Sequence, residues 1–338
     1  MKKAGLARFF YGLFFLVRFF YTLEKSQREP FMIRAQALSK KFAAIQAVRD
    51  FSFQVEKGEV VALLGPNGAG KTSCMRMLSG YLRPDSGSAL IAGRDSCRDP
   101  LAAKRQLGYL AEHAPVYKEH NVLYYLNFIA KARGLAKAKA QTAVDDIFQS
   151  LNLNSIAFQP ISTLSKGSMR RVALAAAVLH RPPALLLDEP SDGLDPIQKQ
   201  LVRSLILELA RNSAILMSTH QIDEVLALCP RTIIMAKGVK LLDQATDDLL
   251  RQSKYHNAVS FVASESIAAR AALEGLSGVT GFEQNAVDGR LYVFVHGNKP
   301  QGQLIADKLS QKNVPFSDIR LEYGRLEEVF SKAVAEAG

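Results

Sequence analysis

The stretch that decides the fold is Val60-Val-Ala-Leu-Leu64, which is followed directly by Gly65-Pro-Asn-Gly-Ala-Gly70-Lys71-Thr72. An apolar strand here enters a loop with the pattern G-x-x-x-x-G-K-[ST], which is typical of a phosphate-binding loop. Glycines let the backbone wrap closely, so that successive N–H groups and the N-terminus of the next helix point at phosphate oxygens. The candidate nucleotide-binding residues are therefore Gly65, Pro66, Asn67, Gly68, Ala69, Gly70, Lys71, Thr72 and Ser73.

Two side chains of this loop have chemical roles of their own. Lys71 is expected to reach the β- and γ-phosphates of a nucleotide, and the Thr72 hydroxyl is expected to hold Mg²⁺. The alternative is an ordinary glycine turn before a helix. It is disfavoured because the fixed positions match together with the strand and helix context.

A second apolar strand, Ala184-Leu-Leu-Leu-Asp188-Glu189-Pro190, ends in two carboxylates. An acid at the end of a buried strand is costly unless it meets a cation. Asp188 suits Mg²⁺, and Glu189 suits a base that polarises an attacking water. A solvated turn is the usual explanation for such an ending taken alone, but a phosphate loop elsewhere in the chain favours the catalytic interpretation.

Short apolar runs alternate with helical patterns along the chain, which predicts an α/β fold with a largely parallel sheet. A purely helical pattern from about 122 to 153 predicts a helical subdomain, at about 113–180, inside a nucleotide-binding domain of residues 31–254. Residues 255–338 read as a small C-terminal α+β domain with helices from about Ser266 and Gln301. The expected strands of the larger domain include Ala47–Val55, Glu59–Leu64, Leu107–Ala111, Ala184–Leu187 and Ala214–Ser218.

Three further motifs stand in a fixed order with these: Leu164-Ser-Lys-Gly-Ser168, Ser191-Asp-Gly-Leu-Asp195 and Ser218-Thr-His220. The ordered set resembles the ABC ATPase family over about residues 31–251. The resemblance implies a P-loop NTPase core of the ABC ATPase type that binds ATP and Mg²⁺ and hydrolyses ATP. It also implies that two chains, most simply a homodimer, sandwich two ATP molecules and drive a separate membrane permease.

The resemblance assigns roles to residues outside the phosphate loop. Ser165 and Gly167 match the signature that contacts the γ-phosphate held by the opposite subunit, and Asp195 matches the loop that crosses the dimer interface. His220 matches the residue that senses the γ-phosphate, so the catalytic set is Lys71, Glu189 and His220. Phe42 stands where the family places an aromatic residue against adenine, although a core position is the alternative.

The chain departs from the family pattern at three positions. Lys166 replaces the first signature glycine, and Ser168 replaces the glutamine. Glu112 stands where the family usually has the Q-loop glutamine, and because a carboxylate can also face Mg²⁺, the expected metal-binding residues are Thr72, Glu112 and Asp188. The signature and the ending Leu326-Glu-Glu-Val-Phe330 resemble exporter ATPases that pair with ABC-2-type permease chains; a generic helix with an apolar face is the alternative for that ending.

Net charge, cysteine spacing and hydrophobicity limit the classes of function that this chain can have. The formal net charge of +11 suits an anionic partner, and a soluble ABC ATPase acting on nucleic acid or ribosomes is the alternative function. A single phosphate loop without a sustained heptad pattern argues against that alternative, so no nucleic acid is expected. Three separated cysteines and the lack of an 18-residue apolar run favour a peripheral protein at the cytoplasmic face of the membrane.

The family resemblance gives no guide to the segment 1–30. On a helical wheel Arg8, Arg18 and Lys25 fall on one stripe, and Phe and Leu residues occupy the rest. The pattern predicts an amphipathic helix that lies on a membrane surface. A poorly ordered extension or an upstream start codon is the alternative.

Overall fold

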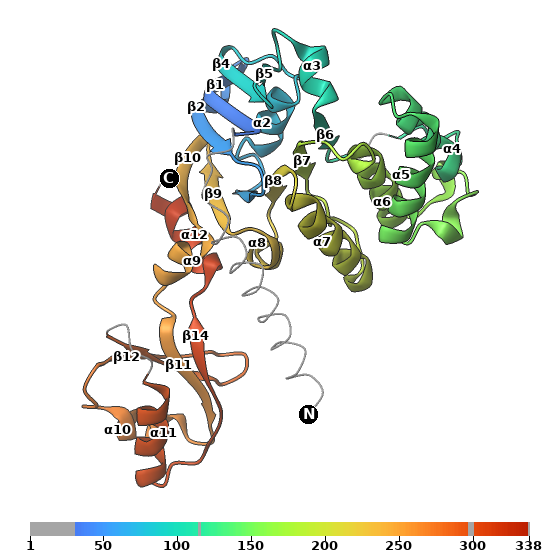
Figure 1. Cartoon of the computed structure of the whole chain (residues 1–338). Helices are drawn as coiled ribbons and strands as arrows, with labels where there is room; N and C mark the ends of the chain where they lie inside the picture. The colour runs from blue at the N-terminus through green and yellow to red at the C-terminus, as the bar shows by residue number, and fades with distance from the viewer. Residues whose placement is uncertain (1–30, 114–115, 297–300, 337–338) are drawn as a thin grey trace. The chain divides into compact units, whose positions relative to one another are not determined.

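The computed structural model describes residues 31–113, 116–296 and 301–336, and Figure 1 shows their course. The chain forms two compact units, and the division between them falls between Gln244 and Ala245. It lies upstream of the predicted boundary at 254/255, because the helix α9 (Thr246–Arg251) packs against α12 (Leu326–Glu336) in the second unit. The segment 1–30, with its predicted membrane-surface helix, lies outside the described residues.

The centre of the first unit is a six-stranded sheet. Four of the five predicted strands lie in this sheet, and the fifth, predicted at Ala47–Val55, lies in a smaller sheet. Four neighbouring pairs of strands in the six-stranded sheet, from β9 to β6, are parallel. Every residue of β3, β7 and β8 is buried, as expected for strands that are covered on both faces. The strands in sheet order are β10 (Val239–Ala245), β9 (Arg231–Ala236), β3 (Val60–Leu64), β8 (Ala214–Thr219), β7 (Ala184–Asp188) and β6 (Leu107–Leu110).

A smaller sheet pairs β1 antiparallel with β2 and β4, in the order β2-β1-β4-β5. The helix α2 (Lys71–Leu78) shares one core with this sheet and with the central sheet, in which Phe51, Met75 and Leu63 are all fully buried. The short helix α3 follows the small sheet. The bounds are β1 (Ile33–Phe42), β2 (Ile45–Val55), β4 (Ser86–Ile91), β5 (Arg94–Asp95) and α3 (Pro100–Arg105).

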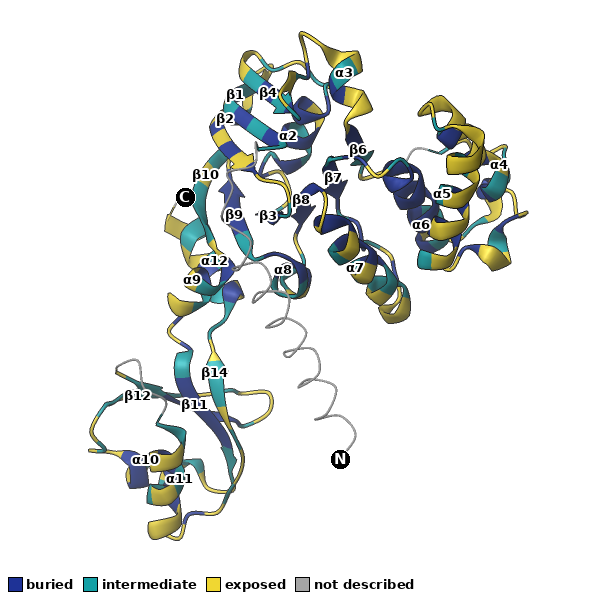
Figure 2. Cartoon of the chain, viewed as in Figure 1, coloured by how far each residue is buried: buried dark blue, intermediate teal, exposed yellow. Residues whose placement is uncertain are grey.

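The helical subdomain lies between β6 and β7 in the sequence and contains α4 (Val122–Ala132), α5 (Lys137–Ser150) and α6 (Lys166–Val178). Figure 1 shows these three helices grouped beyond β6, away from the small sheet. The helix α6 is its most buried element, as Figure 2 shows by its dark colour. Two helices, α7 (Pro196–Ala210) and α8 (Ile222–Leu228), follow β7 and β8.

The second unit is the α+β fold that the sequence predicted. Its sheet has the order β12-β13-β11-β14, and the element order β-α-β-β-α-β is that of a ferredoxin-like fold. Glu328 on α12 accepts hydrogen bonds from Ser253 Oγ (2.5 Å) and from Lys254 N (3.0 Å). The elements are β11 (His256–Ala263), α10 (Ser266–Leu273), β12 (Val279–Gln284), β13 (Leu291–Val295), α11 (Gly302–Gln311) and β14 (Phe316–Tyr323).

Every helix in the described part of the chain is too short or too polar to span a bilayer.

Candidate functional site

The site lies at the carboxyl edge of the central sheet, where the loops after β3, β7 and β8 meet. These strands are parallel, and β3 and β7 both pair with β8, so the residues that follow them lie at the same edge. The loop after β3 is the phosphate loop. Gly70 has φ +107° at the start of α2, and a Cβ there would lie 2.3 Å from the Ala47 carbonyl oxygen. Only glycine fits this position, because both the backbone angle and the space exclude a side chain.

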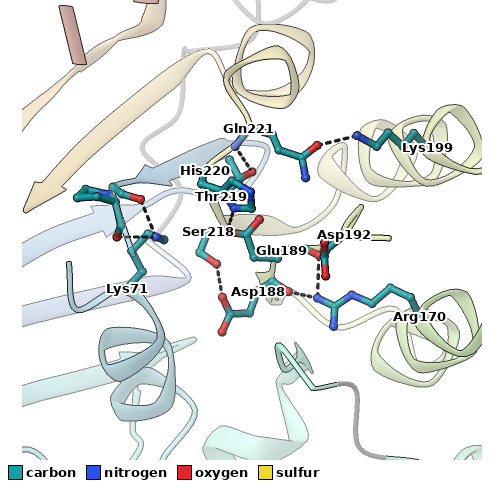
Figure 3. Close-up of polar contacts among 12 residues, drawn as sticks. Lys71, Arg170, Asp188, Glu189, Asp192, Lys199, Ser218, Thr219, His220 and Gln221 are labelled. Carbon is teal, nitrogen blue, oxygen red and sulfur yellow. Dashed lines mark hydrogen bonds and ion pairs between the residues drawn. The ribbon is translucent and has the colours of Figure 1, made fainter. Parts of the chain in front are cut away.

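Lys71 is the first residue of α2, and its ammonium group is buried over the loop. Its Nζ donates to the carbonyl oxygens of Gly65 (2.6 Å) and Pro66 (3.1 Å), as Figure 3 shows. Burial lowers the pKa of Lys71, while the charges of Glu189, Asp188 and Glu112 act to raise it. The lysine therefore lies within the electrostatic field of Asp188 and Glu189 at the end of β7 and of Glu112 after β6.

Asp188, the last residue of β7, is fully buried, and the Ser218 hydroxyl of β8 donates to its Oδ1. Burial raises the pKa of Asp188, whereas hydrogen bonds from Ser218 and Thr72 lower it. Its Oδ2 has no hydrogen-bond partner among the described residues. A buried carboxylate oxygen without a partner, next to a threonine hydroxyl, is a donor set that fits Mg²⁺.

Glu112 follows β6, the strand beside β7. Its charge raises the pKa of Asp188, so the two carboxylates lie within electrostatic range, but the Glu112 side chain is exposed. Within the described residues, no three His, Cys, Asp or Glu side chains form a metal-binding cluster. Proteins commonly hold Mg²⁺ with only one or two carboxylates while substrate phosphates complete its shell.

Glu189 faces His220 across the site. Glu189 Oε1 lies 2.8 Å from His220 Nδ1, and Oε2 has no partner among the described side chains. Burial raises the pKa of Glu189, and the hydrogen bond and charge of His220 lower it. The Glu189 backbone has φ +51°, a left-handed conformation that is uncommon for a residue with a side chain, and its N–H donates to the Ser218 carbonyl (3.0 Å). The free oxygen and the histidine partner suit Glu189 to polarise a water molecule.

Comparison with known proteins decides the family. Residues 48–192 match the family model described as "ABC transporter". Over 207 residues, the chain is 35% identical to "Uncharacterized ABC transporter ATP-binding protein YxlF" of Bacillus subtilis, which covers 61% of this chain and 68% of that protein. The chain belongs to the ABC transporter family. It is an ATP-binding protein of that family and an ATPase.

Two further matches agree. The chain is 35% identical to "Lipopolysaccharide export system ATP-binding protein LptB" of Acidithiobacillus ferridurans over 210 residues, which is 61% of this chain and 87% of that protein. A solved structure of an ATP-binding subunit of an ABC transporter is 29% identical, with a TM-score of 0.62, and covers 65% of this chain and 92% of that chain. Together with the parallel sheet, these matches confirm the predicted ABC-type P-loop fold.

In this ABC cassette the signature segment begins α6. Ser165 is the N-cap, and its Oγ accepts from Ser168 N (3.2 Å), so the helix begins at Lys166. Lys166 Nζ lies 2.7 Å from Asp192 Oδ2, and a Cβ on Gly167 would lie 3.0 Å from the Gly193 carbonyl oxygen. The signature therefore packs against the loop 191–195.

Asp195 and Phe42 are both exposed. Asp195 is exposed and caps α7, where its Oδ1 accepts from Gln198 N (2.8 Å). Phe42, at the end of β1, is 46% exposed, with Lys40 Nζ 5.7 Å from the centre of its ring. The exposure of Phe42 excludes the alternative that it is a core residue.

Sequence reasoning missed Arg170 of α6. It is only 4% exposed, and its guanidinium donates to carbonyl oxygens in both the loop after β6 and the loop after β7. The sequence contains a pattern that could have indicated a buried arginine. Two arginines come directly before a run of small and apolar residues, 172–178, which is typical of a buried helix. A buried charge needs partners nearby.

Proposed function

We propose that this ABC ATPase is the energy-supplying subunit of an exporter, that it acts as a pair of chains, and that its partner is a separate ABC-2-type permease at the cytoplasmic face of a membrane. The observation that supports the ATPase site most strongly is the pair formed by buried Asp188 and partly buried Glu189. Each carboxylate keeps one oxygen without a partner beside Lys71 and His220. The proposed domains are the nucleotide-binding domain of residues 31–254, with its helical subdomain, and the accessory domain of residues 255–338.

Each residue of the site has a separate role. The amides of the phosphate loop and the ammonium group of Lys71 bind the phosphates of ATP, and exposed Phe42 stacks on the adenine. Thr72 and Asp188 would hold Mg²⁺, with Glu112 facing it, and the ion would neutralise phosphate charge. Glu189 polarises the attacking water, and His220 orients the Glu189 carboxylate.

The paired arrangement is supported by the position of the signature. Ser165 is exposed at the positive N-terminus of α6, which packs against the loop that ends in exposed Asp195. In a pair of chains these residues of one cassette would complete the ATP site of the other. The chains then close on the γ-phosphate, and hydrolysis releases them.

Mixing two defective variants tests the pairing. Lys71→Ala removes the phosphate-binding ammonium group but leaves the signature. Ser165→Asp keeps a good N-cap for α6 and places a negative charge against the phosphate. Each variant alone is expected to be inactive. An equal mixture is expected to regain about a quarter of wild-type ATPase, because half of the pairs are mixed and each mixed pair has one intact site of two. A mixture that stays as inactive as the separate variants would contradict the paired site.

A surface on the helical subdomain supports the permease partner. Tyr117, Tyr124 and Phe128 are exposed, with Tyr117 and Phe128 5.7 Å apart between ring centres. The His120 ring lies 4.6 Å from the Tyr124 ring, centre to centre, and is tilted against it by 48°. This aromatic patch follows Glu112 in the chain, and exposed apolar patches mark protein contacts. Export is supported by the Lys166-containing signature and by the name of the lipopolysaccharide export relative.

Co-expression tests the partner. The chain with a six-histidine tag is expected to retain an ABC-2-type permease from detergent extracts, whereas a Tyr117→Ser/Tyr124→Ser variant loses it and keeps its own ATPase activity. Retention by both forms would contradict the assigned surface. Retention of the permease by neither form would contradict the ABC-2-type partner.

A further inference from the structure

The guanidinium of Arg170 joins two loops of the ATP site. Its Nη1 donates to the carbonyl oxygens of Ala111 (2.8 Å) and Glu112 (2.6 Å). Its Nη2 donates to the carbonyl oxygens of Asp188 and of Glu189, the latter at 2.8 Å. One side chain therefore contacts the loop that carries Glu112 and the loop that carries the catalytic carboxylate, as the lower right of Figure 3 shows for the second of these.

The geometry of arginine explains why one residue can do this. The two loops follow β6 and β7, which are neighbouring parallel strands. A planar guanidinium directs its N–H groups in fixed directions, so each terminal nitrogen of Arg170 can serve one loop. Burial lowers the pKa of Arg170, and the nearby charges of Asp188, Asp192, Glu189 and Glu112 oppose this change. The buried cation is therefore compensated by carbonyl dipoles and by the acidic site itself.

The Glu189 backbone needs this support. With φ +51°, Glu189 has a conformation that costs roughly 1–3 kcal/mol and persists only where neighbouring groups hold it. Three hydrogen bonds do so: its N–H donates to the Ser218 carbonyl, and its carbonyl accepts from Arg170 (2.8 Å) and from the Asp192 N–H (3.1 Å). Of these three partners, Arg170 alone also contacts the loop that carries Glu112. This backbone conformation directs the Glu189 side chain to His220.

We propose that Arg170 is a positioning residue for ATP hydrolysis, which holds Glu189 against His220 and fixes the spacing between Glu189 and the Glu112 loop. Arg170 does not touch the reacting groups. A shift of the Glu112 loop is transmitted through the guanidinium to the backbone of Glu189. This inference rests on the proposed role of Glu189 as the water-polarising residue.

The neighbouring Arg171 provides a matched control. It lies on the same helix and is 7% exposed, and its Nη1 also donates to two carbonyl oxygens, those of Leu151 (2.7 Å) and Asn152 (3.0 Å). Those carbonyls belong to the helical subdomain rather than to the loops after β6 and β7. Substitution of Arg171 therefore measures the effect of losing a buried arginine that does not connect the loops after β6 and β7.

The test compares Arg170→Lys with Arg171→Lys in the full chain, measuring ATP affinity, kcat, KM and thermal stability. A lysine has one compact head and cannot serve both loops. Arg170→Lys is expected to lower kcat by about tenfold or more with KM changed less than about twofold. Arg171→Lys is expected to lower the melting temperature similarly but to keep kcat within about threefold of the wild type. Equal kcat values for the two variants would overturn the inference.

A double-mutant cycle separates positioning from general destabilisation. If Arg170 acts through the Glu189–His220 contact, the effects of Arg170→Lys and His220→Ala on kcat are less than multiplicative when combined. Fully multiplicative effects would contradict that route. Arg170→Gln, measured in the same way, replaces Arg170→Lys if the lysine variant fails to bind ATP. Glu189→Gln separates the proposed role of Glu189 from that of Arg170. Wild-type turnover in Glu189→Gln would refute the proposed role of Glu189. An inactive Glu189→Gln variant together with a fully active Arg170→Lys variant would refute only the positioning role of Arg170.

Discussion

His220 Nδ1 lies 2.8 Å from Glu189 Oε1, and the two residues follow the adjacent parallel strands β8 and β7. The sheet therefore sets their separation. His220→Ala is expected to lower kcat about a hundredfold, which is the usual contribution of one acid–base group to the rate. ATP binding should remain. Steady-state ATPase assays and fluorescent-nucleotide binding check this. Unchanged turnover would show that Glu189 needs no partner at this position.

Glu112→Gln is expected to keep ATPase activity, because the amide oxygen of glutamine would face Mg²⁺ in place of the proposed carboxylate oxygen. The exposed position of Glu112 leaves room for either side chain without repacking. A rate loss beyond roughly tenfold, which is about 1.4 kcal/mol of barrier, would show that the negative charge itself has a role. The Mg²⁺ dependence of the rate, measured for both forms, would locate that role.

Much of the fold could be predicted from the sequence because its signals are local. The buried strands β3, β7 and β8 are continuous apolar runs, and the glycine pattern of the phosphate loop identifies the start of α2. The motifs that follow β3, β7 and β8 could be assigned to one edge because parallel strands bring their carboxyl ends together.

What the sequence did not show depends on tertiary contacts. The guanidinium of Arg170 binds carbonyl oxygens 58 to 59 residues away on one side and 18 to 19 residues away on the other. Hydrophobic periodicity in the sequence does not indicate such long-range hydrogen bonds. The hydrogen bond from Ser218 to Asp188 and the packing of α9 on α12 were missed for the same reason.

The helix α12 is expected to stabilise the second unit through Leu326, which is fully buried. Leu326→Ala removes that burial and leaves a cavity, so the unit should lose about 2–5 kcal/mol of unfolding free energy. Leu304→Ala on α11 is the control, because Leu304 is 47% exposed. Limited proteolysis followed by mass spectrometry compares the two. Equal cleavage of residues 245–338 in both variants would contradict the packing role of Leu326.

The membrane-surface role of the segment 1–30 is predicted from the sequence alone. Deletion of residues 1–28 is expected to weaken sedimentation with liposomes of anionic lipid and to leave ATPase activity unchanged. The reason is that burial of several Phe side chains at roughly 1.5–3 kcal/mol each, together with a basic stripe, favours the membrane surface. Neutral liposomes provide the control. Equal sedimentation of the full-length and truncated chains would contradict the prediction.

The most direct test of the whole account is the Glu189→Gln variant with ATP and Mg²⁺, measured for hydrolysis and by gel filtration. The substitution keeps the shape of the side chain but removes the carboxylate that polarises water, so binding should survive and turnover should stop. The variant is expected to bind ATP, hydrolyse almost none and accumulate as a closed dimer, whereas the wild type turns over ATP and stays largely monomeric. Hydrolysis by Glu189→Gln at the wild-type rate would contradict this expectation.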